Sequence, residues 1–332
     1  MTIGRPGVTA ADVGRRRRLL RLGGGRGIVA GIAIDHRDSL RTALERRGLG
    51  DLTTDDLRQL KLRLARALAP AATAIMLDAE LGGLALEQGV VPPTVALIMP
   101  LEAQGYEESG DERITSLLPD FSPADALRYG AEACKLLVPY RADDEKSASR
   151  QDATVRSTAS ACHEVGLPLV VEPVVFRRST EPADEHAAAY ERLVIGAVAR
   201  LQPLGTDVFK LPFPVPDGAA VAESTAIAAC RSLHEACRGT PWVLLGAGVD
   251  TSTFVDQIRL AGMGGASGFL AGRGIWGPAL VADPDEAEGL ASGPAVADLE
   301  RCRAVADRFA RPLAASGPGL LGATAGASRI AG

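Results

Sequence analysis

Short apolar runs alternate with stretches of helical periodicity along most of the chain. Each run is nearly continuous in aliphatic residues, as expected for parallel strands that are covered on both faces. The runs are 27–37, 73–80, 94–101, 133–140, 167–175, 207–215, 241–249 and 266–273. Helical patterns lie between them, for example at 55–68, 146–165, 184–201, 219–237 and 253–262. Eight strands interleaved with helices predict an α/β fold, the closed (β/α)₈ TIM barrel.

An open, doubly wound sheet is the main alternative to the barrel. Its glycine-rich dinucleotide fingerprint is expected directly after the first strand. The first run instead ends in the sequence IDHR at 34–37, and the glycine-rich strand ends lie in the seventh and eighth runs. This placement favours the barrel.

The length of 332 residues fits one barrel with extensions. We expect a single barrel domain over 26–313, preceded by a flexible basic arm at 1–25 and followed by a flexible tail at 314–332. The arginine run at 15–18 is expected to be solvated. The acidic segment 105–119 is expected to be a loop, either over an active-site mouth or on an ordinary surface.

Composition excludes several classes of protein. A net charge of −5 argues against a nucleic-acid partner, which needs a broad basic face. No run approaches the roughly 18 to 20 apolar residues that span a membrane, and the arm has no signal-peptide core. We therefore expect a soluble, cytoplasmic protein.

Cysteine and histidine give little support for a metal site. The five cysteines are odd in number and have no metal-like spacing, which indicates free thiols in a reducing compartment. The four histidines lie far apart in the sequence, although carboxylates could contribute ligands. We expect neither a metal nor a cofactor.

Charged side chains interrupt the apolar runs near their carboxyl ends, where a barrel places its active site. Among 36 basic residues only four are lysines, and two of these lie within such runs. The strand-end candidates are Asp35, His36, Arg37, Asp78, Glu80, Lys135, Glu172, Lys210 and Arg273.

Two interpretations of Lys135, Glu172 and Lys210 remain open at this point. Burying an unpaired charge costs several kcal/mol, so a Lys–Glu pair that stabilises the barrel interior is one of them. The other is chemical, because a desolvated lysine close to a second cation has a lowered pKa, and its neutral amine can attack a ketone. Periodicity does not decide which lysine would lower the pKa of the other.

Small residues at two neighbouring strand ends indicate an anion site. Gly246, Ala247 and Gly248 end the seventh run, and Gly272 and Arg273 end the eighth. In this fold such loops expose backbone N–H groups to phosphate, and an arginine adds charge-assisted hydrogen bonds. Either glycine cluster alone is more often a tight turn, but together they predict a phosphate site.

Six motifs support a family resemblance over residues 27–276. They are AIDHR (33–37), CKLLVPYRADDE (134–145), VEPVV (171–175), FKLPFP (209–214), PWVLLGAGVD (241–250) and GASGFLAGRGIW (265–276). With these motifs the chain resembles the class I aldolases typified by tagatose 1,6-bisphosphate aldolase and its relative sulfofructosephosphate aldolase.

The resemblance implies a role for each candidate. Lys210 would form an imine, with Glu172, Lys135 and Asp35 as its catalytic neighbours, and the glycine loops with Arg273 would hold phosphate. Arg37 and Arg141 match positions that could face the substrate's other anionic end. Three residues depart from the family pattern where substrate is recognised: His36 replaces a glutamine, Gly246 a serine and Pro212 a glutamate.

The implied reaction is cleavage of a phosphorylated ketose to dihydroxyacetone phosphate and an aldehyde. The ketose would be similar to tagatose 1,6-bisphosphate or to 6-deoxy-6-sulfofructose 1-phosphate. The alternatives are an aldolase for another sugar phosphate, a transaldolase-like transfer, or a non-catalytic barrel that binds sugar phosphates. Such barrels often associate, so a homo-oligomer is a further expectation.

Overall fold

Eight parallel strands close into a barrel in the computed structural model, which describes residues 8–109, 112–216, 219 and 221–315. The strands follow one another around it in the order β1-β10-β9-β8-β7-β6-β3-β2. They are β1 (Val29–Ala33), β2 (Ala74–Met76), β3 (Ala96–Pro100), β6 (Ala133–Tyr140), β7 (Leu169–Val175), β8 (Val208–Leu211), β9 (Trp242–Leu245) and β10 (Gly268–Ala271). Each of the eight apolar runs contains one strand, so the predicted TIM barrel is confirmed.

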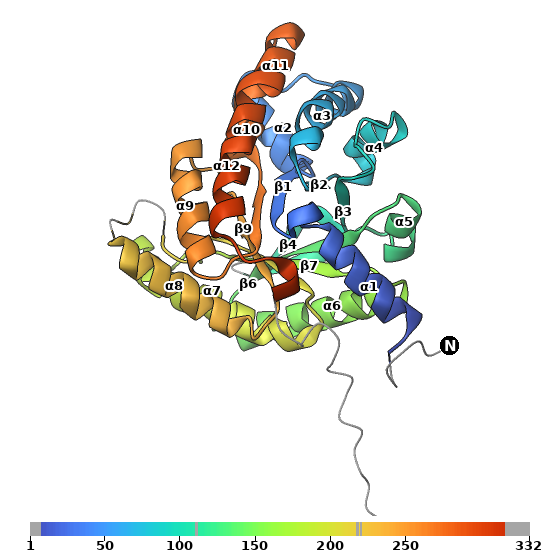
Figure 1. Ribbon diagram of the computed structural model, residues 1–332. Helices are drawn as coiled ribbons and strands as arrows, with labels where there is room; N and C mark the ends of the chain where they lie inside the picture. The colour runs from blue at the N-terminus through green and yellow to red at the C-terminus, as the bar shows by residue number, and fades with distance from the viewer. Residues whose placement is uncertain (1–7, 110–111, 217–218, 220, 316–332) are drawn as a thin grey trace, which may run out of the picture.

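Helices surround the strands on the outside (Figure 1). Those that follow the first strands are α2 (Asp38–Glu45), α3 (Thr54–Leu68), α4 (Ala79–Glu87), α5 (Pro123–Arg128) and α6 (Glu145–Glu164). The remainder are α7 (Ala183–Leu201), α8 (Glu223–Ala236), α9 (Thr251–Met263), α10 (Arg273–Trp276), α11 (Pro284–Leu290) and α12 (Val296–Phe309). Within the described residues, no helix is both long and apolar enough to cross a membrane.

The alternation of side chains along each strand determines what enters the barrel. Residues two apart on a strand point to the same face. Ala133, Val170 and Val208 belong to the small apolar cluster that fills the interior near the strand beginnings. Lys135 and Lys210, two positions further along β6 and β8, therefore point into the barrel nearer its C-terminal mouth, and Glu172 does the same from β7.

The expectation of a flexible arm is wrong for the described part of residues 1–25. Residues Ala10–Arg21 form helix α1, which lies beside α6 (Figure 1). Leu19 and Leu22 are buried and pack with the interior cluster at the N-terminal end of the barrel. Two of the arginines are also engaged: Arg15 pairs with Asp207, and Arg18 donates to the Gly166 carbonyl. The helix thus covers the end of the barrel opposite the strand-end residues.

The first residues after α12 lie close to helix α1. Leu313 is fully buried in the same interior cluster, and its N–H donates to the Gly27 carbonyl at 2.8 Å. The expected tail at 314–332 falls outside the described residues from 316 onward.

The segment 105–119 is not the loop that was expected. Its described part forms an antiparallel hairpin of β4 (Glu102–Ser109) and β5 (Glu112–Leu117). The hairpin leaves the barrel just after the carboxyl end of β3 and contacts β6 and α6. Glu102, the first residue of β4, is consequently held close to the mouth of the barrel.

The docking of α1 gives a first prediction. Leu19→Ala should lower the free energy of unfolding by about 2–5 kcal/mol, because it removes a fully buried side chain from a packed interior. Val13→Ala on the same helix, where the side chain is 39% exposed, should change it by less than about 1 kcal/mol. Urea unfolding followed by circular dichroism measures both. Equal effects of the two substitutions would show that α1 does not pack on the barrel.

Candidate active site

Five charged side chains form one buried network at the C-terminal mouth of the barrel. Lys210 Nζ lies 2.9 Å from Glu172 Oε1, and Glu172 Oε2 lies 3.2 Å from Lys135 Nζ. Lys135 Nζ is also 3.2 Å from Asp35 Oδ2 and pairs with Glu102 Oε1. All five residues are buried. The structure thus brings together the four expected catalytic residues and adds Glu102, which sequence reasoning missed.

Lys135 is the fixed cation of this network. Burial alone would lower the pKa of its ammonium group, but Glu102, Asp35 and Glu172 outweigh burial and raise that pKa well above its ordinary value. Lys135 therefore remains positively charged. Among the described residues, Lys210 has one carboxylate within ion-pair distance, Glu172, whereas Lys135 has three.

Two of the carboxylates remain ionised. Burial alone would raise the pKa of Asp35, but Lys135 and the other nearby cations hold it below its usual value. Burial is likewise outweighed at Glu172, where Lys210 and Lys135 lower the pKa. Glu172 Oε2 is buried and accepts no hydrogen bond from the described residues, since its contact with Lys135 is purely ionic. This oxygen is able to accept a proton from a bound molecule.

His36 follows Asp35 at the rim of the network. Its ring packs edge-on against Trp276 at 5.3 Å between centroids, and its Nδ1 lies 3.8 Å from Asp35 Oδ1. Burial lowers the pKa of His36 to about 4, although Asp35 opposes this shift. The imidazole is therefore neutral at pH 7, and it lies in the mouth as an uncharged hydrogen-bonding group.

The two glycine clusters approach each other closely. A Cβ atom on Gly246 would lie 3.2 Å from the Gly272 nitrogen, and one on Gly274 would lie 2.6 Å from the Val249 carbonyl oxygen. These glycines line a shared cavity of about 10 Å³, which has room for at most one water molecule. Phosphate would have to lie above the loops rather than between them. Ala247, Gly248 and Arg273 are exposed there.

The two other expected arginines differ in their surroundings. Arg37 is buried, and its Nη2 donates to the Glu102 carbonyl at 2.6 Å. Arg141 directs all five of its N–H groups to protein acceptors, namely the carboxylates of Asp143 and Glu181 and the carbonyl of Phe176. No N–H group of Arg141 is left for a substrate, so its expected role at the distal anion is not supported by this geometry.

The two candidates that follow β2, Asp78 and Glu80, have structural roles. Asp78 caps α4 by accepting the Leu81 N–H, and it forms a fully buried ion pair with Lys61 from α3. Glu80 is exposed on α4. We assign both residues to the support of the helices rather than to the network around Lys135.

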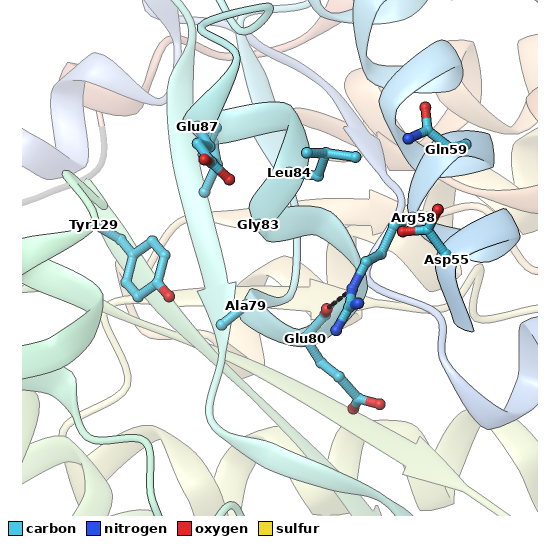
Figure 2. A pocket seen from close by; sticks show the side chains of 10 residues that line it. Asp55, Arg58, Gln59, Ala79, Glu80, Gly83, Leu84, Glu87 and Tyr129 are labelled. Atoms are coloured by element: carbon cyan, nitrogen blue, oxygen red, sulfur yellow. Dashed lines mark hydrogen bonds between the residues drawn. The ribbon is translucent and has the colours of Figure 1, made fainter. Parts of the chain in front are cut away.

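A groove of about 670 Å³ lies on the outside of the barrel. It lies between α3 and α4, and Figure 2 shows Arg58 reaching the Glu80 carbonyl, 3.2 Å away, across it. Tyr129 borders the groove opposite these helices (Figure 2). None of the five network residues lines the groove, so its size does not mark the chemical site.

Comparison with known proteins agrees with the barrel fold. The model of the family described as "DeoC/LacD family aldolase" matches residues 30–277. The chain belongs to the DeoC/LacD family of aldolases. It is therefore a carbon–carbon lyase, which confirms the expected enzyme class and the family resemblance.

Similar proteins include two tagatose 1,6-diphosphate aldolases. One from Streptococcus pyogenes (serotype M3) is 29% identical over 268 residues, covering 75% of this chain and 81% of the relative. One from Enterococcus faecalis is 27% identical over 276 residues, covering 79% and 84%.

Solved structures of two fructose-bisphosphate aldolases share the fold. The enzyme from Plasmodium falciparum has a TM-score of 0.67 at 13% identity, covering 91% of this chain and 95% of that one. The enzyme from Slackia heliotrinireducens has a TM-score of 0.62 at 21% identity, covering 93% and 96%.

The environment of His36 gives a second prediction. We expect its ring to protonate near pH 4 instead of near the ordinary value of 6.5, because burial disfavours the imidazolium ion. As the pH falls from 6.5 towards 4, the unfolded chain binds this proton before the folded chain does, so the protein loses stability. Ring ¹⁵N signals, assigned with His36→Gln, report the titration. A midpoint near 6.5 would contradict the buried, neutral ring.

Proposed function

We propose that the protein is a class I aldolase in which Lys210 forms an imine with the C2 carbonyl of a phosphorylated ketose. The observation that carries this proposal is a buried amine at the barrel mouth that is paired with Glu172 while a second lysine, Lys135, is fixed as a cation. The relatives named for tagatose 1,6-diphosphate support a bisphosphorylated ketose or one with an anionic group at each end.

Imine formation needs the neutral amine of Lys210. The fixed charge of Lys135 disfavours a second ammonium ion nearby, and Glu172 Oε1, at 2.9 Å, is within reach of the proton that Lys210 gives up. The nitrogen lone pair then forms the bond to C2. Glu172 passes on to the carbonyl oxygen the two protons that the Lys210 nitrogen gives up, so that the oxygen leaves as water and Glu172 is ionised again. The Lys135 ammonium assists by a hydrogen bond to this oxygen and keeps its own proton. The product is a protonated imine.

Cleavage uses the imine as an electron sink. Glu172, through its Oε2 atom, takes the proton from the C4 hydroxyl, and that oxygen forms the carbonyl of the departing aldehyde. The electron pair of the C3–C4 bond moves to C2–C3 and neutralises the imine nitrogen, which gives an enamine. After the aldehyde leaves, protonation at C3 and hydrolysis release dihydroxyacetone phosphate and restore Lys210. The positive imine thus supplies the polarisation that a metal ion supplies in other aldolases.

We place the phosphate of the dihydroxyacetone phosphate half above the loops that end β9 and β10. Backbone groups of Gly246–Gly248 and Gly272, with the exposed guanidinium of Arg273, are suited to an anion there. His36 adds a neutral hydrogen-bonding group on the same side, because its ring lies 3.6 Å from the position of a Cβ on Gly272. For the distal phosphate or sulfonate, Arg37 remains the candidate.

Borohydride trapping tests the proposed nucleophile. Incubation with dihydroxyacetone phosphate and borohydride should add a stable mass to Lys210, because reduction converts the imine to a secondary amine. Lys210→Ala should lose both this label and aldol cleavage, whereas Lys146→Ala, which changes an exposed lysine on α6, should retain both. Peptide mass spectrometry locates the label. A label on Lys135 would refute the assignment of the two lysines.

Exhaustive chelation tests the absence of metal chemistry. We expect full cleavage activity after dialysis against a chelator, since the proposed reaction needs no Lewis acid besides the protonated imine. Activity is measured on tagatose 1,6-bisphosphate and on 6-deoxy-6-sulfofructose 1-phosphate, which also separates the two substrate candidates. Loss of activity that added divalent metal restores would establish a metal-dependent aldolase instead.

A further inference from the structure

Glu102 stands where the third strand leaves the barrel. The register of β3 with β6 ends at the pair Pro100 and Lys135, and the chain then turns outward into the β4–β5 hairpin. Although Glu102 is the first residue of that hairpin, it is only 4% exposed. Its carboxylate points back across the end of β6 and towards the network.

Other protein groups hold both the carboxylate and the carbonyl of Glu102 in place. Oε1 pairs with Lys135 Nζ, and Oε2 accepts the Leu137 N–H at 3.2 Å. Its carbonyl accepts from Arg37 Nη2 at 2.6 Å. With both carboxylate oxygens engaged by protein groups, Glu102 is placed to orient a neighbour rather than to contact a substrate.

We propose that Glu102 is a positioning residue that holds the Lys135 ammonium group between Asp35 and Glu172 and keeps it protonated. The inference rests on the proposed function, in which Lys135 assists proton transfer. A lysine has a long, flexible side chain, so an ammonium group held by only Asp35 and Glu172 could shift away from one of them. The third carboxylate, from the hairpin side, opposes that movement.

The titratable groups around Lys135 come from several elements. Asp35 and His36 follow β1, Glu172 comes from β7, and Lys210 comes from β8. Glu102 is the contribution of the hairpin. Burial raises the pKa of Glu102, in contrast to the lowered values at Asp35 and Glu172, so its charge is the first of the three to be lost on acidification.

The test is Glu102→Gln, which keeps the shape and removes the charge. We expect kcat to fall by up to about 100-fold with KM close to that of the wild type, because the groups that act in the transition state are displaced while substrate still binds. The basic limb of the kcat profile should move to lower pH, since fewer carboxylates retain the Lys135 proton. Glu102→Asp should recover part of the pH profile, because it restores the charge at a shorter reach.

A matched control exists at the opposite end of the barrel. Glu132 is also buried, accepts the Leu97 N–H at 2.9 Å, and pairs with Arg21 at 2.9 Å. Glu132→Gln removes a similar set of contacts far from the mouth. It should leave kcat and the pH profile of the folded enzyme unchanged, even if it lowers the melting temperature as much as Glu102→Gln does.

A measurement without substrate separates this inference from the proposed function. The chain has only four lysines, so ¹³C-labelled lysine gives few signals, and Lys135 can be assigned by substitution. Its pKa should fall in Glu102→Gln and not in Glu132→Gln. If Glu102→Gln lowers the pKa of Lys135 but the wild-type protein is never trapped by borohydride, the imine mechanism fails and the inference about Glu102 stands. If Lys210 is trapped while Glu102→Gln alters neither kcat nor the Lys135 titration, the inference about Glu102 is overturned.

Discussion

The burial of one ammonium group constrains the whole mouth of this barrel. An isolated charge inside a protein costs several kcal/mol, and the Lys135 cation is tolerated because three carboxylates from separate parts of the chain meet it. Those carboxylates fix the ends of β1 and β7 and the start of the hairpin relative to β6. Removing any one of them takes away a contact that holds Lys135 and changes the charge balance of the network, so the stability of the mouth and its chemistry depend on the same contacts.

The barrel interior is divided into an apolar end and a charged end by the alternation of its strands. Small aliphatic side chains fill the layer near the strand beginnings, and α1 with Leu19 seals that layer from solvent. The next inward positions on β6, β7 and β8 carry charge. Because α1 and the apolar layer pack the other end, the charged groups lie at the end of the barrel where the glycine loops and the hairpin also lie.

The sequence alone was enough to predict the residues that stand out within the apolar runs. Lys135, Glu172 and Lys210 could be found because a charge inside an apolar run is conspicuous, and strand alternation then places all three inside. Glu102 lies one residue beyond the third run and before the acidic segment 105–119, so neither pattern included it. The leucines of α1 were obscured by neighbouring arginines and glycines. The partners of Arg141 could not be predicted, because Glu181 reaches it from the loop after another strand.

The departures from the family pattern are not independent in space. A Cβ atom on Gly272 would lie 3.6 Å from the His36 ring and 3.9 Å from the Gly246 carbonyl oxygen, and the His36 ring packs on Trp276. Replacing a serine at 246 removes a hydroxyl donor from β9, and the histidine at 36 brings a neutral ring to the same glycine from β1. Residues that share a partner couple energetically, so these two differences constitute one local change at the proposed phosphate end. Pro212 directly follows β8, the strand that carries Lys210, and is buried, so it lies near Lys210 in the chain and not in the glycine loops.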